Sequence, residues 1–592
     1  MRGSAKTEVL LIVGVVLGWA VLGAIIANPY YRLIAALVPI WAIFAVSWNI
    51  FSGYSGLISF GHAAFFGLGA YTVVLTLRTF DLTPWLGLPL AFMVGAVAGA
   101  AIGYITLRLK GIYFGLSMLA YPLVMAYVFE WLGFQEVTFP IKRDNPAAYM
   151  QFSDYWAYTL IALAFLLVVL LASLWIERTR FGMSLFAIKQ NQLAAEAAGV
   201  DTFRWQMLAL ILSGAIATGA GGLYSTVVLV VTPSSVFGLV TSAQAVILAI
   251  FGGTGVLWGP LIGAAIFVPL GDILQARLGH VLPGIQGVVL GIAIIAVVLL
   301  APEGIYWRIR DALAKRAPIQ KPQSKASSDV GAPTLVVNRK PPVEPSYSPI
   351  LRVRAVSRFY GGLKAVNNVS FDVAAGEIVG IIGPNGAGKT TLFNLLNGIV
   401  PLSAGEVQFR GQAINGLKPN RICRLGIGRT FQVVRPFARM SVLENVVVGS
   451  YAAHDSEGEA WQAAREAVRR VGLDDRAEIP AGRLTNKDLR LMELARALAG
   501  QPTLILMDEP LAGLGATETQ ALVAVISRLR ADGITIVIIE HTMQAMVSVV
   551  DRFIVLNQGG FLTEGVPAAV TQDKRVIEAY LGRKWAVGHA AG

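Results

Sequence analysis

The chain has 592 residues, of which 55% are hydrophobic and only 14% charged, and its formal net charge at pH 7 is +12. Soluble domains carry about 25% charged residues, so this composition excludes a single soluble domain. Its one cysteine, Cys423, excludes an internal disulfide and any multi-cysteine metal site. The basic residues flank apolar stretches, which is typical of membrane topology rather than of nucleic-acid binding.

Residues 8 to 302 form a series of apolar stretches, each long enough to cross a hydrocarbon core of about 30 Å as a helix. Arg2 and Lys6 precede the first stretch, as in a signal peptide, but Asn28-Pro29 is a poor cleavage site and favours a retained helix. We expect three apolar segments within 205–302, preceded by spans at 8–27, 31–51, 56–77, 84–107, 111–134 and 155–176.

The distribution of basic residues predicts the topology. With the N-terminus in the cytoplasm, six crossings also place the basic loop 178–204 there. Residues 205–302 must then cross an even number of times, because the ATPase described below must be cytoplasmic. The middle segment, 241–275, is too short for two full spans, so we expect two half-helices or strongly tilted short helices. Its glycines, in Phe251–Gly255 and Trp258–Pro260, indicate either a transport pathway or close helix packing.

Proline, serine, lysine and glutamine replace the apolar pattern between Lys315 and Pro349. A coil of this length spans about 30 Å on average, so the segment reads as a flexible tether. We therefore predict a membrane domain at 1–314, a linker at 315–349 and a second, soluble domain at 350–592.

The second domain contains a phosphate-binding loop near its start. Glu377–Gly383 reads as a buried strand that runs into a complete G-x-x-x-x-G-K-T motif ahead of a helix. Backbone N–H groups of such a loop surround phosphates, Lys389 neutralises the β- and γ-oxygens, and Thr390 ligates magnesium. The expected cofactors are ATP and Mg²⁺, and the expected binding residues are Gly383, Pro384, Asn385, Gly386, Ala387, Gly388, Lys389, Thr390 and Thr391.

Two further strands end in polar residues. Thr503–Pro510 ends in two carboxylates, of which Asp508 is placed to hold magnesium, directly or through water, and Glu509 to polarise the attacking water. Ile534–Ile539 is followed by Glu540 and His541, and His541 is placed to contact the γ-phosphate. The alternatives are a solvated strand end and a structural histidine.

With these motifs in place, residues 350–583 resemble an ABC-transporter ATPase subunit. The resemblance implies that Tyr360 stacks on adenine and that Leu511–Gly515 faces a partner subunit. It also implies that Gln432, in Arg429–Gln432, contacts magnesium, senses the γ-phosphate and couples to the membrane domain. Within that family the chain is most similar to the ATPases of branched-chain amino acid importers, through Phe359–Val366, Gly428–Gln432 and Arg575–Gly582.

The chain departs from the family at the signature motif of the L-S-G-G-Q type, which clamps the γ-phosphate bound to the opposite subunit. Thr485 keeps a hydroxyl, but Lys487 replaces a glycine that lets the backbone approach phosphate closely. We expect either one slow or inactive ATP site in an asymmetric dimer, or two sites that turn over equally. The degenerate signature consists of Leu484, Thr485, Asn486, Lys487 and Asp488.

Residues 1–310 resemble the permeases of the same importers, in Asn49–Gly67, Arg178–Gly199 and Phe251–Pro260. We predict that Gln190–Ala198 is the coupling helix, which sits in a groove of an ATPase subunit; a surface-lying amphipathic helix is the alternative.

Polar residues at membrane depth are functional candidates by default. Here they are Asn49, His62 and Gln244. The alternative for Asn49 and His62 is that they bridge helices, which we prefer for His62.

Together these features predict a polytopic α-helical membrane domain followed by an α/β P-loop ABC ATPase domain. We expect a multi-pass protein of the bacterial inner membrane with a cytoplasmic ATPase, which imports branched-chain amino acids or related small amino acids, amides or carboxylates. The expected partners are a second permease, a second ATPase, an extracytoplasmic binding protein and membrane lipid, with no nucleic acid; a heteromer is favoured over a homodimer. The competing functions are an exporter half-transporter, whose helices would continue into the cytoplasm, and a nucleotide-gated channel.

Overall fold

The computed structural model describes residues 5–109, 111–142, 145–278, 284–300, 304–309, 349–541 and 546–581. The chain divides into two compact units, one made of Met1–Lys189 with Phe203–Lys325, the other of Gln190–Thr202 with Ala326–Gly592. The expected linker at 315–349 lies outside the described residues except for Pro349, so its boundaries stay a prediction.

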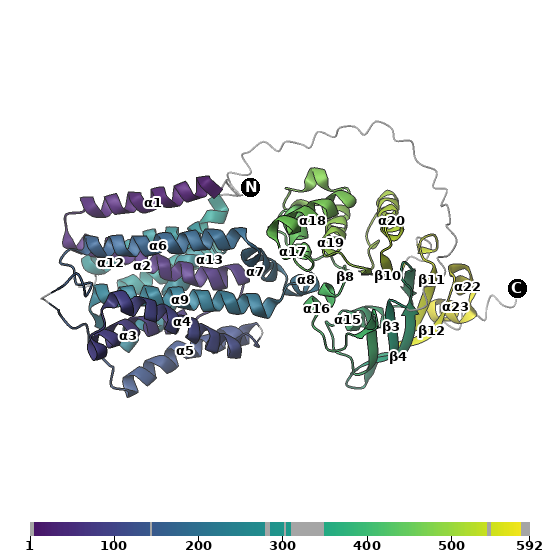
Figure 1. The fold of residues 1–592 in the computed structure, drawn as a ribbon, viewed down its shortest axis with the longest axis horizontal. Coiled ribbons are helices and arrows are strands. Elements are labelled where there is room, and N and C mark those ends of the chain that lie inside the picture. The colour runs from purple at the N-terminus through teal and green to yellow at the C-terminus, as the bar shows by residue number, and fades with distance from the viewer. Residues whose placement is uncertain are drawn as a thin grey trace. The chain divides into compact units, whose positions relative to one another are not determined.

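The first unit is a helical bundle, coloured purple to teal in Figure 1. Nine segments among its described residues are long and apolar enough to cross a membrane. A two-stranded antiparallel sheet pairs β1, Val137–Thr138, with β2, Val230–Val231. The helices are α1 (Ala5–Ile25), α2 (Pro29–Trp48) with a π-helical turn (Asn49–Gly53), α3 (His62–Phe80), α4 (Pro84–Thr106), α5 (Ile112–Trp131), α6 (Tyr155–Arg178), α7 (Arg180–Gln190), α9 (Thr202–Val228), α10 (Pro233–Val236), α11 (Leu239–Gly252), α12 (Trp258–Leu278) and α13 (Ile285–Leu300).

The third span begins later than expected, at His62 rather than at residue 56. Residues 56–61 ahead of it form a loop that is exposed at Ile58 and Phe60 but buried at Ser59. The polar groups of Ser59 are satisfied inside the protein: the indole of Trp48 donates to its carbonyl oxygen at 2.7 Å, and its N–H donates to the Ser52 hydroxyl at 3.1 Å. Hydropathy cannot distinguish such an apolar loop from a helix.

The middle segment at 241–275 breaks where its glycines predicted, between α11 and α12. The expectation of short helices was wrong for α12, which is 21 residues long, whereas α11 has 14 residues and reaches 20 only together with α10. At Gly252, an added Cβ would lie 1.7 Å from the carbonyl oxygen of Gly259, and at Gly263, 1.9 Å from that of Leu248. These contacts favour close helix packing as the role of these two glycines.

The second unit contains two sheets, in green to yellow in Figure 1. The antiparallel sheet has the order β4-β3-β6-β7 and the mainly parallel sheet the order β12-β11-β5-β10-β9-β8, with only β12 antiparallel to its neighbour. The strands are β3 (Leu351–Tyr360), β4 (Leu363–Val373), β5 (Ile378–Ile382), β6 (Ala404–Phe409), β7 (Gln412–Ala413), β8 (Ile427–Arg429), β9 (Leu504–Asp508), β10 (Thr535–Ile539), β11 (Arg552–Asn557) and β12 (Gly560–Gly565).

The second unit also contains helices, some packed on the sheets and others on one another. They are α8 (Gln192–Ala197), α15 (Lys389–Leu396), α16 (Pro419–Arg424), α17 (Val442–Ser450), α18 (Glu457–Arg470), α19 (Asn486–Ala499), α20 (Ala516–Ala531), α22 (Pro567–Gln572) and α23 (Lys574–Leu581). The central strands β5, β9 and β10 are buried at every residue, as expected for parallel strands covered on both faces. Phe371, Val379, Phe393 and Leu506 belong to the core that joins the two sheets.

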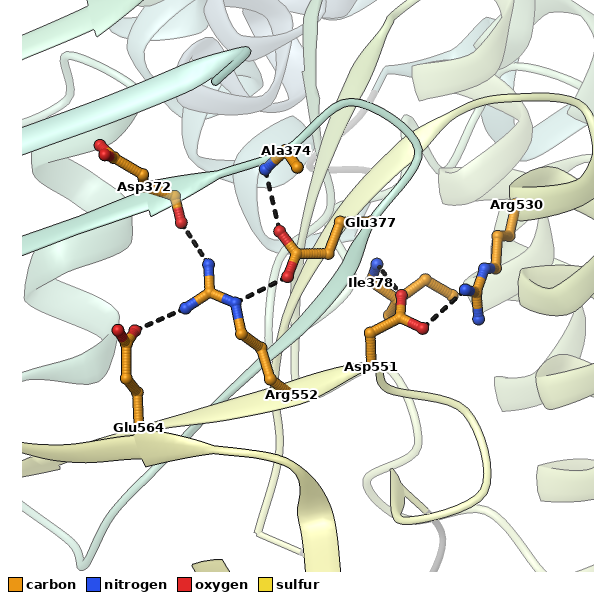
Figure 2. A network of polar contacts seen from close by, with 8 residues as sticks. All are labelled: Asp372, Ala374, Glu377, Ile378, Arg530, Asp551, Arg552 and Glu564. Carbon is orange, nitrogen blue, oxygen red and sulfur yellow. Dashed lines mark hydrogen bonds and ion pairs between the residues drawn. The ribbon is translucent and has the colours of Figure 1, made fainter. Parts of the chain in front are cut away.

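A charged network fixes the start of β11 (Figure 2). The Arg552 guanidinium donates to Glu377 at 2.6 Å, to Glu564 on β12 at 2.5 Å, and to the backbone carbonyl oxygen of Asp372 on β4. The neighbouring Asp551 points the other way, where it accepts from the Ile378 N–H at 2.9 Å and from Arg530 at 2.6 Å. This network therefore ties β11 to β5, β12 and the second sheet.

Candidate active site

The phosphate-binding loop lies between β5 and α15, as the motif predicted. Its first and last glycines, Gly383 and Gly388, have φ of 154° and 93°. A Cβ at Gly383 would lie 2.2 Å from the carbonyl oxygen of Leu556, and one at Gly388 would lie 2.3 Å from that of Ala365. Only glycine fits these two positions, and the loop can therefore curl tightly enough to direct N–H groups at a phosphate.

The Lys389 side chain folds back over this loop. Its ammonium donates to the carbonyl oxygens of Gly383 at 2.7 Å and Pro384 at 3.0 Å. Burial lowers the pKa of Lys389, although Glu509 and Asp508 oppose this effect. The phosphate of a bound nucleotide would give this ammonium a negatively charged partner in place of the two neutral carbonyl oxygens.

The three predicted catalytic residues meet at one point. Gln432 donates its amide N–H to one oxygen of Glu509 at 2.8 Å, and His541 Nε2 lies 2.5 Å from the other oxygen. They converge because β9 and β10 are parallel neighbours in register at Asp508 and Ile539, so that their carboxyl ends coincide. Glu509 itself has a φ of 48°, which is uncommon outside glycine and places it where active-site strain is often found.

Asp508 is buried beside Glu509 and is only 1% exposed. Burial raises the pKa of Asp508 to about 6, against the opposing effect of Arg429, whose guanidinium lies 3.7 Å away. Among the described residues, its Oδ1 has no hydrogen-bond partner. A buried carboxylate oxygen without a partner, together with the hydroxyl of Thr390 in the first turn of α15 and the amide oxygen of Gln432 on the loop after β8, fits the oxygen chemistry that Mg²⁺ prefers.

Burial of Asp508 predicts a pH dependence of stability. Since its pKa rises from 3.8 to about 6 on folding, the folded state binds the proton more tightly, and stability falls as pH rises through that window, by about 3 kcal/mol at about 1.4 kcal/mol per pKa unit. Asp508→Asn should therefore gain stability relative to the wild type between pH 4.5 and 7. Thermal unfolding of the nucleotide-free chain measures this; an offset that does not change with pH would contradict it.

Arg429 is a site residue that the sequence named only as part of a motif. Its guanidinium donates to the carbonyl oxygen of Phe393 at 3.2 Å and to the Asn394 side chain at 2.7 Å, and burial lowers its pKa to about 10. It therefore holds α15, which follows the phosphate-binding loop, and provides a positive charge close to Asp508.

Helix α19 holds the loop that carries Gln432, which the sequence did not predict. Buried Glu493 accepts from the N–H groups of Phe431 at 3.2 Å and Arg435 at 3.4 Å, and Arg490 donates to the Phe431 carbonyl oxygen at 3.0 Å. Arg490 also reaches the carbonyl oxygen of Ala512, in the segment expected to face a partner, at 3.4 Å. The one local sign of this role was the pair of charged residues Arg490 and Glu493, three positions apart on a helix. Their partners lie far away in sequence, so the pair alone could not identify the contact.

The degenerate signature forms the start of α19. Thr485 caps the helix by accepting from the Asp488 N–H at 3.3 Å, and its hydroxyl donates to the Asp488 carboxylate at 2.7 Å. The same carboxylate contacts Arg476. The hydroxyl that the family directs at a phosphate is thus already bonded to an acidic side chain.

Tyr360 and the segment Leu511–Gly515 keep their expected roles as predictions. Tyr360 is 46% exposed, and the Arg358 guanidinium lies 4.6 Å from the centroid of its ring. The Leu511 N–H donates to Glu540 at 2.7 Å, which fixes the start of the segment beside the end of β10.

The predicted coupling helix, Gln190–Ala198, falls within residues 190–202, which belong to the second unit. The helix observed there is shorter, α8 (Gln192–Ala197), and Asn191 separates it from α7. The side-chain oxygen of Gln190 accepts from the Arg439 N–H at 2.9 Å, and the Gly199 carbonyl oxygen accepts from Arg424 on α16 at 3.3 Å. Gly199 has a φ of 90°, and an added Cβ would lie 2.7 Å from the Cβ of Ala452. At Gly199 this segment therefore has no room for a larger side chain beside Ala452.

The three polar candidates of the first unit differ in their partners. Asn49, in the π-helical turn, donates to the Val256 carbonyl oxygen at 3.0 Å and accepts from the Gly255 N–H at 2.8 Å, so it bonds the break between α11 and α12. Both ring nitrogens of His62 bond serine hydroxyls, of Ser59 at 2.8 Å and Ser213 at 2.7 Å. These contacts favour helix bridging for both residues. Gln244, on α11, is partly buried.

Family models match three parts of the chain. Residues 30–298 match "Branched-chain amino acid transport system / permease component", residues 366–512 match "ABC transporter", and residues 562–586 match "Branched-chain amino acid ATP-binding cassette transporter".

Curated relatives match the second half. The chain is 38% identical over 250 residues to the high-affinity branched-chain amino acid transport ATP-binding protein BraF of Pseudomonas aeruginosa, and 39% identical over 250 residues to LivG of Escherichia coli. It covers 98% of each relative, and each covers 40% of this chain.

Solved structures match the same half. A nucleotide-free ATP-binding cassette of an ABC transporter, and a cassette in its ADP conformation, are each 31% identical with a TM-score of 0.37. The matches cover 40% of this chain and all of each cassette.

Proposed function

The chain belongs to the branched-chain amino acid group of ABC transporters, and on that premise we propose that it is a fused permease and ATPase subunit of an importer for branched-chain amino acids or related small amino acids, amides or carboxylates. It is a membrane protein that couples ATP hydrolysis to transport. The observation that carries the proposal is a permease match and an ATP site on one polypeptide, with Glu509 between Gln432 and His541.

ATP-dependent uptake tests this function. Inner-membrane vesicles that contain the complete transporter and its extracytoplasmic binding protein should take up labelled leucine, isoleucine or valine, or a related amide or carboxylate, only with ATP. Uptake without ATP, or ATP-dependent efflux, would reject import.

The residues of the site divide the work of hydrolysis. The phosphate-binding loop and Lys389 hold the phosphates, and Glu509 accepts a proton from the attacking water while Gln432 and His541 fix its two oxygens. Mg²⁺, when bound, neutralises charge on the phosphates, and Asp508, Thr390 and Gln432 would hold it. Gln432 contacts Glu509 and, in the family, the γ-phosphate. Loss of the γ-phosphate on hydrolysis would therefore change the position of its loop, and this change is passed to the rest of the unit.

The packing of residues 190–202 supports the proposed coupling role of Gln190–Ala198. They lie between two helices of the membrane unit in sequence, yet they bond Arg424 and Arg439 of the ATPase unit. A movement of the ATPase therefore pulls directly on the polypeptide that continues into α9.

The transporter needs two ATPase and two permease units, and we propose a heteromer. The Thr485–Asp488 pair keeps this chain's signature hydroxyl away from a phosphate, and the Asp488 carboxylate would repel one. Single-site nucleotide trapping should therefore find turnover about tenfold slower in the site that this chain's signature completes. Equal turnover in both sites would remove the asymmetric model.

The rival functions fit less well. The longest described helix, α9, has 27 residues, so the described part has no helix that crosses a membrane and continues far beyond it, as exporter helices do. A channel that ATP only gates does not need the Glu509 and His541 contact. A bacterial inner membrane, with the ATPase in the cytoplasm, completes the proposal.

A further inference from the structure

The last described helix contacts the phosphate-binding loop. Tyr580, on α23, accepts a hydrogen bond at its hydroxyl oxygen from the N–H of Gly383, at 2.7 Å. Gly383 is buried and is the first residue of the loop. This C-terminal helix takes no part in the hydrolysis steps proposed above, yet its tyrosine contacts a residue almost 200 positions away in sequence.

A second contact from the same C-terminal segment holds the other end of the loop. At the tip between β11 and β12, the N–H of Gly559 donates to the carbonyl oxygen of Ala387 at 3.2 Å, and its carbonyl oxygen accepts from the Asn367 N–H at 2.7 Å. The start of β11 is fixed in turn by the Arg552 and Asp551 network (Figure 2). The segment from Asp551 to Tyr580 is therefore anchored at its base and bonds both ends of the loop.

The position of the Tyr580 contact matters for nucleotide binding. The N–H of Gly383 is bonded to Tyr580 and its carbonyl oxygen to the Lys389 ammonium, at 2.7 Å each, so both polar groups of one peptide position are fixed by side chains. A loop that binds phosphate through its backbone loses affinity when it must be ordered at the moment of binding. Without the hydroxyl, a buried N–H is left unpaired, which disfavours this loop geometry.

We propose that Tyr580 is a positioning residue for the ATP site, which holds the phosphate-binding loop in its nucleotide-ready shape through Gly383. This inference rests on the proposed function, because it requires that ATP binds at this loop. It predicts an effect on affinity rather than on turnover, since bound phosphates order the loop themselves once the site is saturated.

The test is Tyr580→Phe in the full chain in lipid nanodiscs, which keeps the ring and removes only the hydrogen-bond acceptor. Binding of Mg-ATP should weaken about tenfold and the KM for ATP should rise by a similar factor, while kcat at saturating ATP stays within about twofold of wild type. The matched control is Tyr451→Phe, which removes a tyrosine hydroxyl bonded to Glu457 at 3.0 Å elsewhere in the unit and should leave ATP affinity unchanged.

Unchanged ATP affinity in Tyr580→Phe overturns the inference, as does an equal loss in Tyr451→Phe. Lys389→Ala, measured in parallel, should abolish binding and so locates the nucleotide on this loop. A wild-type chain that binds no ATP would refute the proposed function itself, a result distinct from normal binding that is insensitive to Tyr580.

Discussion

Replacing Glu509 with glutamine should lower ATP hydrolysis at least about 100-fold while ATP binding is retained. The amide has nearly the shape of the carboxylate and can still accept the 2.8 Å hydrogen bond from Gln432, but it cannot take a proton from water. Hydrolysis measured by phosphate release, binding measured by titration and uptake into vesicles together test this expectation.

Glu459→Gln provides the control for lost charge. Its side chain is 68% exposed and lies on α18, a helix that carries none of the site residues, so hydrolysis should stay at the wild-type rate. Substrate uptake that persists in Glu509→Gln would refute both the role of Glu509 and ATP-powered import.

Replacing Gly199 with valine should separate hydrolysis from transport. The residue has a φ of 90°, and even a bare Cβ would lie 2.7 Å from the Cβ of Ala452, so the branched side chain must displace residues 190–202 from the ATPase surface. Because the catalytic residues lie on other segments, we expect basal ATP hydrolysis within about threefold of wild type. Uptake, and stimulation by the loaded binding protein, should fall more than about tenfold, through loss of contacts worth about 1.4 kcal/mol or more.

Gly472→Val is the matched control. That glycine also has a positive φ, of 76°, but an added Cβ there would have no neighbour within 4 Å. It therefore reproduces the backbone strain, of about 1–2 kcal/mol, without the collision. If both variants retain the same uptake, the coupling role of residues 190–202 is wrong.

The grouping of the candidate catalytic residues could be predicted because most of them follow the end of a buried strand. The motif around Lys389, the carboxylates at 508 and 509, and His541 follow β5, β9 and β10, and parallel neighbours bring their carboxyl ends together without any knowledge of long-range contacts. The apolar stretches gave most spans within a few residues for a similar local reason, since length and hydropathy decide them.

What the sequence could not predict depends on partners distant in the chain. In the sequence Glu493 could not be distinguished from an ordinary helix residue, because the two N–H groups that its carboxylate accepts from lie about 60 residues away. The start of α3 was missed because its preceding loop is as apolar as a helix, and its polar groups are satisfied by Ser52 and Trp48. Tyr580 gave no signal beyond family likeness, since nothing local links it to Gly383.

Residues 190–202 belong to the same compact unit as the ATPase, and this limits how the two halves of such a chain can be exchanged between proteins. A transplant of the nucleotide-binding half at the linker alone would leave this short stretch behind in the recipient's membrane half, facing a foreign surface. A working chimera would need two grafts, with the minor one carrying Gln190 and Gly199 alongside the major one. The ATPase unit and the membrane unit of this polypeptide are therefore not separated by a single boundary in the sequence.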